Sequence, residues 1–137
     1  MEFASDSRRP GSDQDIAAIN EWCLSRAAPG LVVVVQRVQW GVYEYCLDEI
    51  VRLHARAHRI HLAEHGTFDS AGRFTGRPKG RFSILIPTRD VLHAAINGLA
   101  WLYDRPAYRR ELSQSEQRLR AFARVQHLPT GNSAPYP

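Results

Sequence analysis

The stretch RIHLAEHGTFDSAGRFTGRPKGRFSILIP, residues 59–87, has an apolar run near each end and a polar, glycine-rich segment between them. The polar segment has too few apolar side chains to form a core element, and we expect Phe68 and Phe74 to anchor it. Residues 81–87 alternate apolar with other side chains, which predicts a strand. We therefore predict two strands joined by a basic, glycine-rich loop.

The segment just before this stretch fits two interpretations. As a helix, it would begin at Asp48, because apolar residues then recur every three or four positions. As a strand, it would place Tyr43 and Tyr45 on one face. Helix propensity favours the first interpretation, and the tyrosine-rich first half favours the second. We predict strands at Val42–His54 and Arg59–Ala63.

The remaining segments have clearer patterns. A helix is expected to start at Ser12 or Asp13 and to stop before Pro29, because apolar residues between them recur at helical spacing. Leu31–Val38 contains four consecutive valines, which predicts a buried strand.

The C-terminal part of the chain has two helical patterns. Thr88 can cap a second helix whose apolar stripe continues to Leu102. Helical spacing resumes over Tyr108–Gln126, where Ser115 is a candidate start for a shorter helix.

These elements predict an α+β fold. We expect an N-terminal helix, a small SH3-like or barrel-like antiparallel sheet of about four strands, and one or two C-terminal helices. A closed sheet is preferred because closure hides the strand edges. The expected domain boundaries are a disordered arm at 1–12, a single domain at 13–127 and a flexible tail at 128–137.

The composition is that of a globular protein: 137 residues, 44% hydrophobic, with a net charge of +4. Arginine supplies every positive charge except that of Lys79, which suits bidentate phosphate contacts and equally fits a GC-rich genome. No apolar run is long enough to span a membrane, and no signal peptide is evident. We expect a cytoplasmic protein without a membrane partner. Cys23 and Cys46 are expected to be core residues.

The glycine-rich loop is the main candidate binding site. Its glycines let backbone amides approach an anion, its cations neutralise phosphates, and an aromatic ring can stack on a base. The alternative is a solvated connection rich in turn residues. The candidate residues for nucleic-acid or partner binding are Arg73, Phe74, Arg77, Lys79, Arg81 and Trp40. We also expect Trp101 to contact a protein partner if it is exposed.

A second basic face is expected on the C-terminal helix and just before it. It comprises Arg109, Arg110, Arg118, Arg120 and Arg124. Such charged faces commonly serve only solvation.

Catalysis and cofactor binding are not expected. His54, His58, His61 and His65 would line one helix face and suit a metal ion, but the predicted strands separate them. No serine carries a G-x-S-x-G motif, and both cysteines lie in apolar segments. We therefore expect a non-catalytic binding protein that contacts nucleic acid or a nucleoprotein complex and has no cofactor.

The middle half of the chain resembles small uncharacterised proteins of phages and mobile elements. The resemblance rests on the segments 41–45, 59–62, 66–68, 78–80 and 85–88. It implies a small SH3-like or barrel-like sheet followed by a helix, a strand at 42–54, and no assigned enzyme activity. By analogy, such a protein binds nucleic acid or blocks a host protein, as anti-CRISPR inhibitors do.

Overall fold

The strand β2 (Val42–His54) runs through the middle of the sheet and pairs with three other strands. Along one edge it pairs with β1 (Val32–Gln39) over the full length of that strand. Along the other edge it pairs with β6 (Leu99–Leu102) near its start and with β3 (Arg59–Leu62) near its end. All three pairings of β2 are antiparallel. The computed structural model describes residues 8–127 of the chain.

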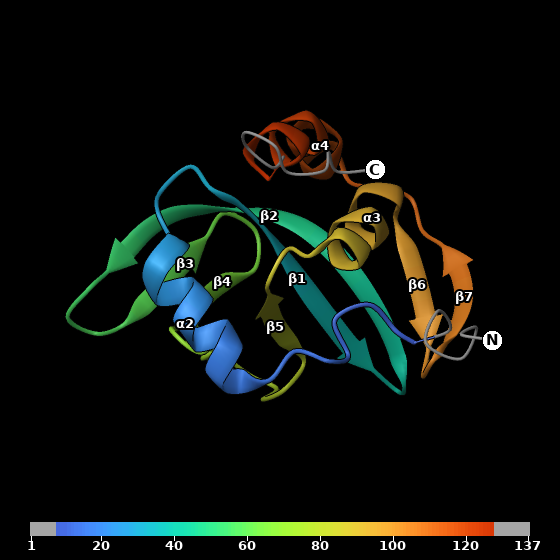
Figure 1. Ribbon diagram of the computed structural model, residues 1–137, viewed down its shortest axis with the longest axis horizontal. Coiled ribbons are helices and arrows are strands. Elements are labelled where there is room, and N and C mark those ends of the chain that lie inside the picture. The colour runs from blue at the N-terminus through green and yellow to red at the C-terminus, as the bar shows by residue number, and fades with distance from the viewer. Residues whose placement is uncertain (1–7, 128–137) are drawn as a thin grey trace, which may run out of the picture.

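Three further strands extend the sheet. β5 (Phe82–Leu85) pairs with β1, β4 (Gly66–Asp69) pairs with β3, and β7 (Arg105–Arg109) pairs with β6. Figure 1 shows the resulting sheet curling into a half-barrel. The predicted α+β class with a barrel-like antiparallel sheet is therefore confirmed. The described part of the chain has seven strands, so the prediction of about four was too low.

Three helices complete the fold: α2 (Ile16–Arg26), α3 (Arg89–Asn97) and α4 (Gln114–Gln126). The carboxylate of Asp15 accepts a hydrogen bond from the Ala18 amide and so caps α2. α3 and α4 pack against β1 and β2 and cover the sheet as Figure 1 shows. None of these helices combines the length and apolar character that a membrane crossing requires.

One continuous core lies between the sheet and the helices. The four consecutive valines of β1 are all buried, as the sequence predicted. Tyr45 and Phe68 are the largest fully buried side chains. The Tyr45 hydroxyl donates to the carbonyl of Pro10 at 2.7 Å, and Pro10 is itself buried. Residues 9–11 are therefore packed into the fold, which corrects the prediction that the disordered arm extends to residue 12. The rest of the predicted arm, residues 1–7, and the predicted tail, residues 128–137, lie outside the described residues.

Between its pairings with β6 and β3, β2 leaves the edge of residues 45–49 without a strand partner. Side chains satisfy the backbone there: Arg110 Nη2 donates to the Tyr45 carbonyl at 2.5 Å, and the Leu47 amide donates to Glu116 Oε2 at 3.1 Å. Arg110 and Glu116 also form two hydrogen bonds with each other, at 2.8 Å and 2.5 Å. The gap in the ladder is closed by this half-buried ion pair.

The Glu116 carboxylate also takes part in the N-terminal cap of α4. The Ser113 hydroxyl accepts from the Glu116 amide, while Glu116 Oε1 accepts from the Ser113 amide, both at 3.1 Å. This is a capping box, and it sets the helix start one residue before Ser115, the predicted start. Burial would raise the pKa of Glu116, but its hydrogen bonds with Arg110, Ser113 and Leu47 lower it overall.

The predicted second helix ends earlier than expected. α3 stops at Asn97 because Gly98 adopts a left-handed conformation with φ of 67°. A Cβ atom at Gly98 would lie 2.5 Å from the carbonyl oxygen of Arg110, so only glycine fits this position. Residues 99–102 form β6 rather than a continuing helix, and Tyr108 belongs to β7 rather than to the start of a helix.

We predict that Glu116→Gln lowers the free energy of unfolding by about 3 kcal/mol, because it leaves the half-buried Arg110 guanidinium without its counter-charge. Urea denaturation checks this, with Glu111→Gln as the matched control at an exposed position. The control is expected to change stability by less than about 0.5 kcal/mol. Equal losses in the two variants would contradict the role given to the ion pair.

Candidate functional site

Three connections lie together at one end of the sheet, along the lower edge of Figure 1. The Val38 amide donates to the Arg81 carbonyl at 2.8 Å, which places the end of the glycine-rich loop beside the last residues of β1. The Tyr103 amide donates to the Gly41 carbonyl at 2.8 Å, which joins the β6–β7 turn to the β1–β2 turn. We call this surface the loop end: residues 40–41, 77–81 and 103–104.

Two aromatic side chains are exposed at the loop end. Trp40 is 87% exposed and Tyr103 is 64% exposed. Both have left-handed backbones, with φ of 55° and 53°. Bulky residues seldom adopt this conformation, and the two-residue hairpin turn at residues 40–41 requires it. A Cβ atom at Gly41 would lie 2.5 Å from the Tyr103 ring, so the glycine makes room for that ring.

The cationic side chains of residues 77–81 differ in their exposure to solvent. Arg77 and Lys79 are exposed, and within residues 8–127 neither has a carboxylate partner. Lys79 Nζ makes only a 3.5 Å contact with the carbonyl of Thr75. Arg81 is half-buried beside β1. The Val38–Arg81 hydrogen bond brings Arg81 to the turn that carries Trp40, whereas Lys79 lines a cavity beside Ile16 and Ile19 of α2.

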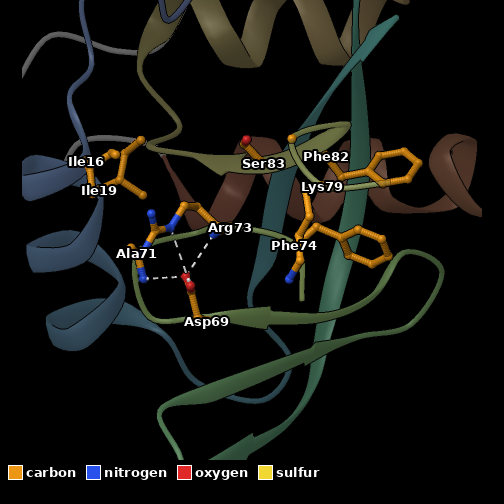
Figure 2. A pocket seen from close by; sticks show the side chains of 10 residues that line it. Ile16, Ile19, Asp69, Ala71, Arg73, Phe74, Lys79, Phe82 and Ser83 are labelled. Atoms are coloured by element: carbon orange, nitrogen blue, oxygen red, sulfur yellow. Dashed lines mark hydrogen bonds and ion pairs between the residues drawn. The ribbon is translucent and has the colours of Figure 1, made fainter. Parts of the chain in front are cut away.

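Arg73 and Phe74 are engaged by other side chains: Figure 2 shows Arg73 beside Asp69 and the Phe74 ring beside Phe82. Arg73 Nε lies 3.5 Å from Asp69 Oδ2. The Phe74 ring packs against Phe68 and Phe82, with ring centroids 5.4 Å and 5.2 Å away. The prediction that Phe74 anchors the loop is therefore confirmed, and the ring is not free to stack on a base.

A cavity of about 490 Å³ lies where the loop meets α2. Figure 2 shows Ile16 and Ile19 on one wall, with Arg73 and Lys79 reaching toward the space. Its lining is amphipathic and includes the Arg73–Asp69 ion pair together with Lys79, which the cavity shares with the loop end.

The second basic face does not form as predicted. Arg110 points inward to Glu116, so it is removed from any open basic surface. Arg109 is exposed on β7, Arg118 and Arg124 are exposed on α4, and Arg120 is half-buried there. Trp101 is 9% exposed and belongs to the core, which corrects its expected role as an exposed contact.

The four histidines lie on strands and turns, as the strand prediction required. His54 and His61 are diagonal neighbours on β2 and β3, and their rings meet edge to face with centroids 5.5 Å apart. Desolvation and the charges of Arg52 and His54 lower the pKa of His61. His58 sits in the β2–β3 turn, and no group of three or more metal-binding side chains occurs among the described residues.

His65 forms a polar cluster with Asp48 and Cys46 that sequence reasoning missed. Its Nδ1 lies 2.7 Å from Asp48 Oδ2, and Asp48 is completely buried. Asp48 also accepts the amides of Glu64 and His65, which ties the β3–β4 turn to β2. Burial lowers the pKa of His65, but hydrogen bonds with Asp48 and Cys46 and their charges raise it to about 9. The signal in the sequence was the Cys-x-Asp spacing, which puts both side chains on one face of a strand.

Comparison with protein-family models, curated proteins and solved structures finds no match to this chain. Its function is therefore inferred from the geometry of the chain itself.

We predict that the protein loses stability as the pH rises from about 6.5 to about 9. The folded pKa of His65 lies above its ordinary value of 6.5, so the stabilisation is complete below pH 6.5 and is lost as the pH passes 9. Solvent screens the part-exposed ring, so we expect a loss of about 2 kcal/mol.

Urea denaturation at several pH values measures this loss in the wild type and in His65→Gln. The variant should lack the decline, whereas His54→Gln, at an exposed position, should keep it. A decline of the same size in His65→Gln would assign it to another group.

Proposed function

We propose that the protein binds nucleic acid at the loop end, through phosphate contacts from Arg77, Lys79 and Arg81. The observation that carries the proposal is that Arg77 and Lys79 are exposed and have no carboxylate partner in the described part of the chain. Cations that are not neutralised internally remain available to release counterions from a phosphate backbone.

The neighbouring aromatics extend this proposal. Trp40 and Tyr103 project from turns that adjoin the loop through the hydrogen bonds of Val38 and Gly41. Exposed rings beside unpaired cations are the arrangement with which proteins bind single strands, where bases stack on the rings. We therefore expect single-stranded nucleic acid to bind more tightly than duplex.

A second candidate is a protein partner, as for an inhibitor or adaptor. The exposure of Trp40 favours it, and Tyr103 and Tyr108, 47% exposed, lie on the adjoining β6–β7 hairpin. Tryptophan, tyrosine and arginine are the residues that dominate the affinity of protein interfaces.

We predict salt-sensitive binding of a fluorescent single-stranded oligonucleotide of about 20 nucleotides, followed by anisotropy at about 50 and 200 mM salt. The double variant Arg77→Gln/Lys79→Gln should bind about tenfold more weakly, and its salt slope should fall by about 0.7 for each phosphate that it no longer neutralises. Its control, Arg118→Gln/Arg124→Gln, removes the same charge from exposed positions on α4.

The control should bind within about twofold of the wild type. Absence of binding at low salt, or equal losses in the two double variants, would exclude the loop end as a nucleic-acid site.

For the second candidate, we predict that a nuclease-treated pull-down with the tagged protein retains a stoichiometric protein partner and that Trp40→Ala loses it. Loss of a hot-spot tryptophan is expected to weaken such a complex by about 2 kcal/mol or more. Phe122→Ala is the control, because Phe122 is also exposed, at 54%, but lies on α4. A partner that disappears on nuclease treatment would instead favour binding through nucleic acid.

A further inference from the structure

The cavity of about 490 Å³ beside α2 lies between that helix and the segment 69–83. Figure 2 shows Ile16 and Ile19 of α2 on one side of it, and Ile16 is 55% exposed. Ala71, Phe74 and Phe82 add further apolar lining. Cavities of this size hold small organic ligands in other proteins, and their lining is mostly apolar with a few polar groups.

The Asp69 side chain is committed to the turn that follows β4. Its Oδ1 accepts hydrogen bonds from the Ala71 amide at 2.9 Å and from the Arg73 amide at 3.0 Å. Its Oδ2 lies 3.5 Å from Arg73 Nε. Both carboxylate oxygens therefore have partners within the turn, and neither pairs with a second cation.

Lys79 is the cation of the lining that lacks a counter-charge. Its Nζ contacts the Thr75 carbonyl at 3.5 Å, and no carboxylate pairs with it within residues 8–127. The lining thus contains two cations, Arg73 and Lys79, against the single carboxylate of Asp69. The cavity therefore combines one excess positive charge with an apolar surface.

This combination favours one class of ligand over others. A neutral apolar molecule would cover Ile16 and Ile19 but would leave the charge of Lys79 unpaired. A small inorganic anion would pair with Lys79 but would leave the two isoleucines in contact with water. A monocarboxylate with an apolar body meets both requirements.

We propose that the cavity binds a free monocarboxylate with an apolar body, such as a medium-chain fatty acid. The carboxylate pairs with the Lys79 ammonium, and the hydrocarbon covers Ile16 and Ile19. Arg73 offers further donors from its terminal nitrogens, because its ion pair with Asp69 uses Nε. The proposal does not rest on nucleic-acid binding, since only residues 79–80 belong to both the cavity and the loop end.

Titration of the ¹⁵N-labelled protein with octanoate, followed by amide chemical shifts in NMR spectra, tests this proposal. We expect saturable shifts at residues 16–19 and 69–83, with a Kd below about 1 mM. Octanamide has the same chain without the charge and should bind about fivefold more weakly. Acetate has the charge without the chain and should bind at least about tenfold more weakly.

Two variants separate the charge from the apolar surface. Lys79→Gln should weaken octanoate binding about fivefold, and Ile16→Ser should weaken it about threefold or more. Arg77→Gln is the matched control, because Arg77 is an exposed cation of the same loop that does not line the cavity. It should bind octanoate within about twofold of the wild type. The spectrum of each variant shows directly whether it is folded.

The proposal is overturned if octanoate causes no saturable shifts, or if octanamide binds as tightly as octanoate. It is also overturned if Lys79→Gln and Arg77→Gln weaken binding equally. Saturable shifts confined to the β2–β3 hairpin would likewise overturn it, because they would place the ligand at another surface.

Discussion

Most of the structure depends on the hydrogen bonds of the Glu116 carboxylate, because β2, Arg110 and the start of α4 all meet there. It accepts from the Leu47 amide in the gap of the β2 edge, it pairs with Arg110, and it closes the capping box at Ser113. Since β2 pairs with β6 at one end and β3 at the other, the backbone between them needs partners from outside the sheet. The buried anion and its arginine supply partners for Tyr45 and Leu47 and fix α4 against the sheet, while the Ala63 amide donates to the Glu49 carbonyl.

The gap in the β2 edge also separates the polar cluster around Asp48 from the loop end. Because no strand covers residues 45–49, the β3–β4 turn can fold back and place His65 beside Asp48 and Cys46. The loop end is built by pairings on the other side of the gap, where β1, β2 and β6 reach their turns. The polar cluster therefore lies within the sheet, whereas the unpaired cations and exposed rings lie at its end.

The sequence predicts the fold class because its strongest signals are local. The four valines of β1 and the tyrosines of β2 indicate strands, and the structure confirms both. The sequence pattern wrongly predicts a helix at residues 99–102. The segment LAWL continues the apolar spacing of α3, and only Gly98 marks the end of the helix. The pattern also misses β7, whose side chains are all exposed and so carry no apolar alternation. The sequence identified the cations of the glycine-rich loop, but it could not place Arg81 beside Val38, because that contact depends on pairing between distant strands, which no local pattern encodes.

The central claim is that the loop end, and no other surface, meets nucleic acid. Hydrogen–deuterium exchange with and without a single-stranded oligonucleotide tests it most directly, because it reports every segment at once. We predict slower exchange confined to residues 38–42, 76–82 and 102–105. Slower exchange confined to α4 or to the β2–β3 hairpin, or unchanged exchange with the oligonucleotide in excess, would contradict the account.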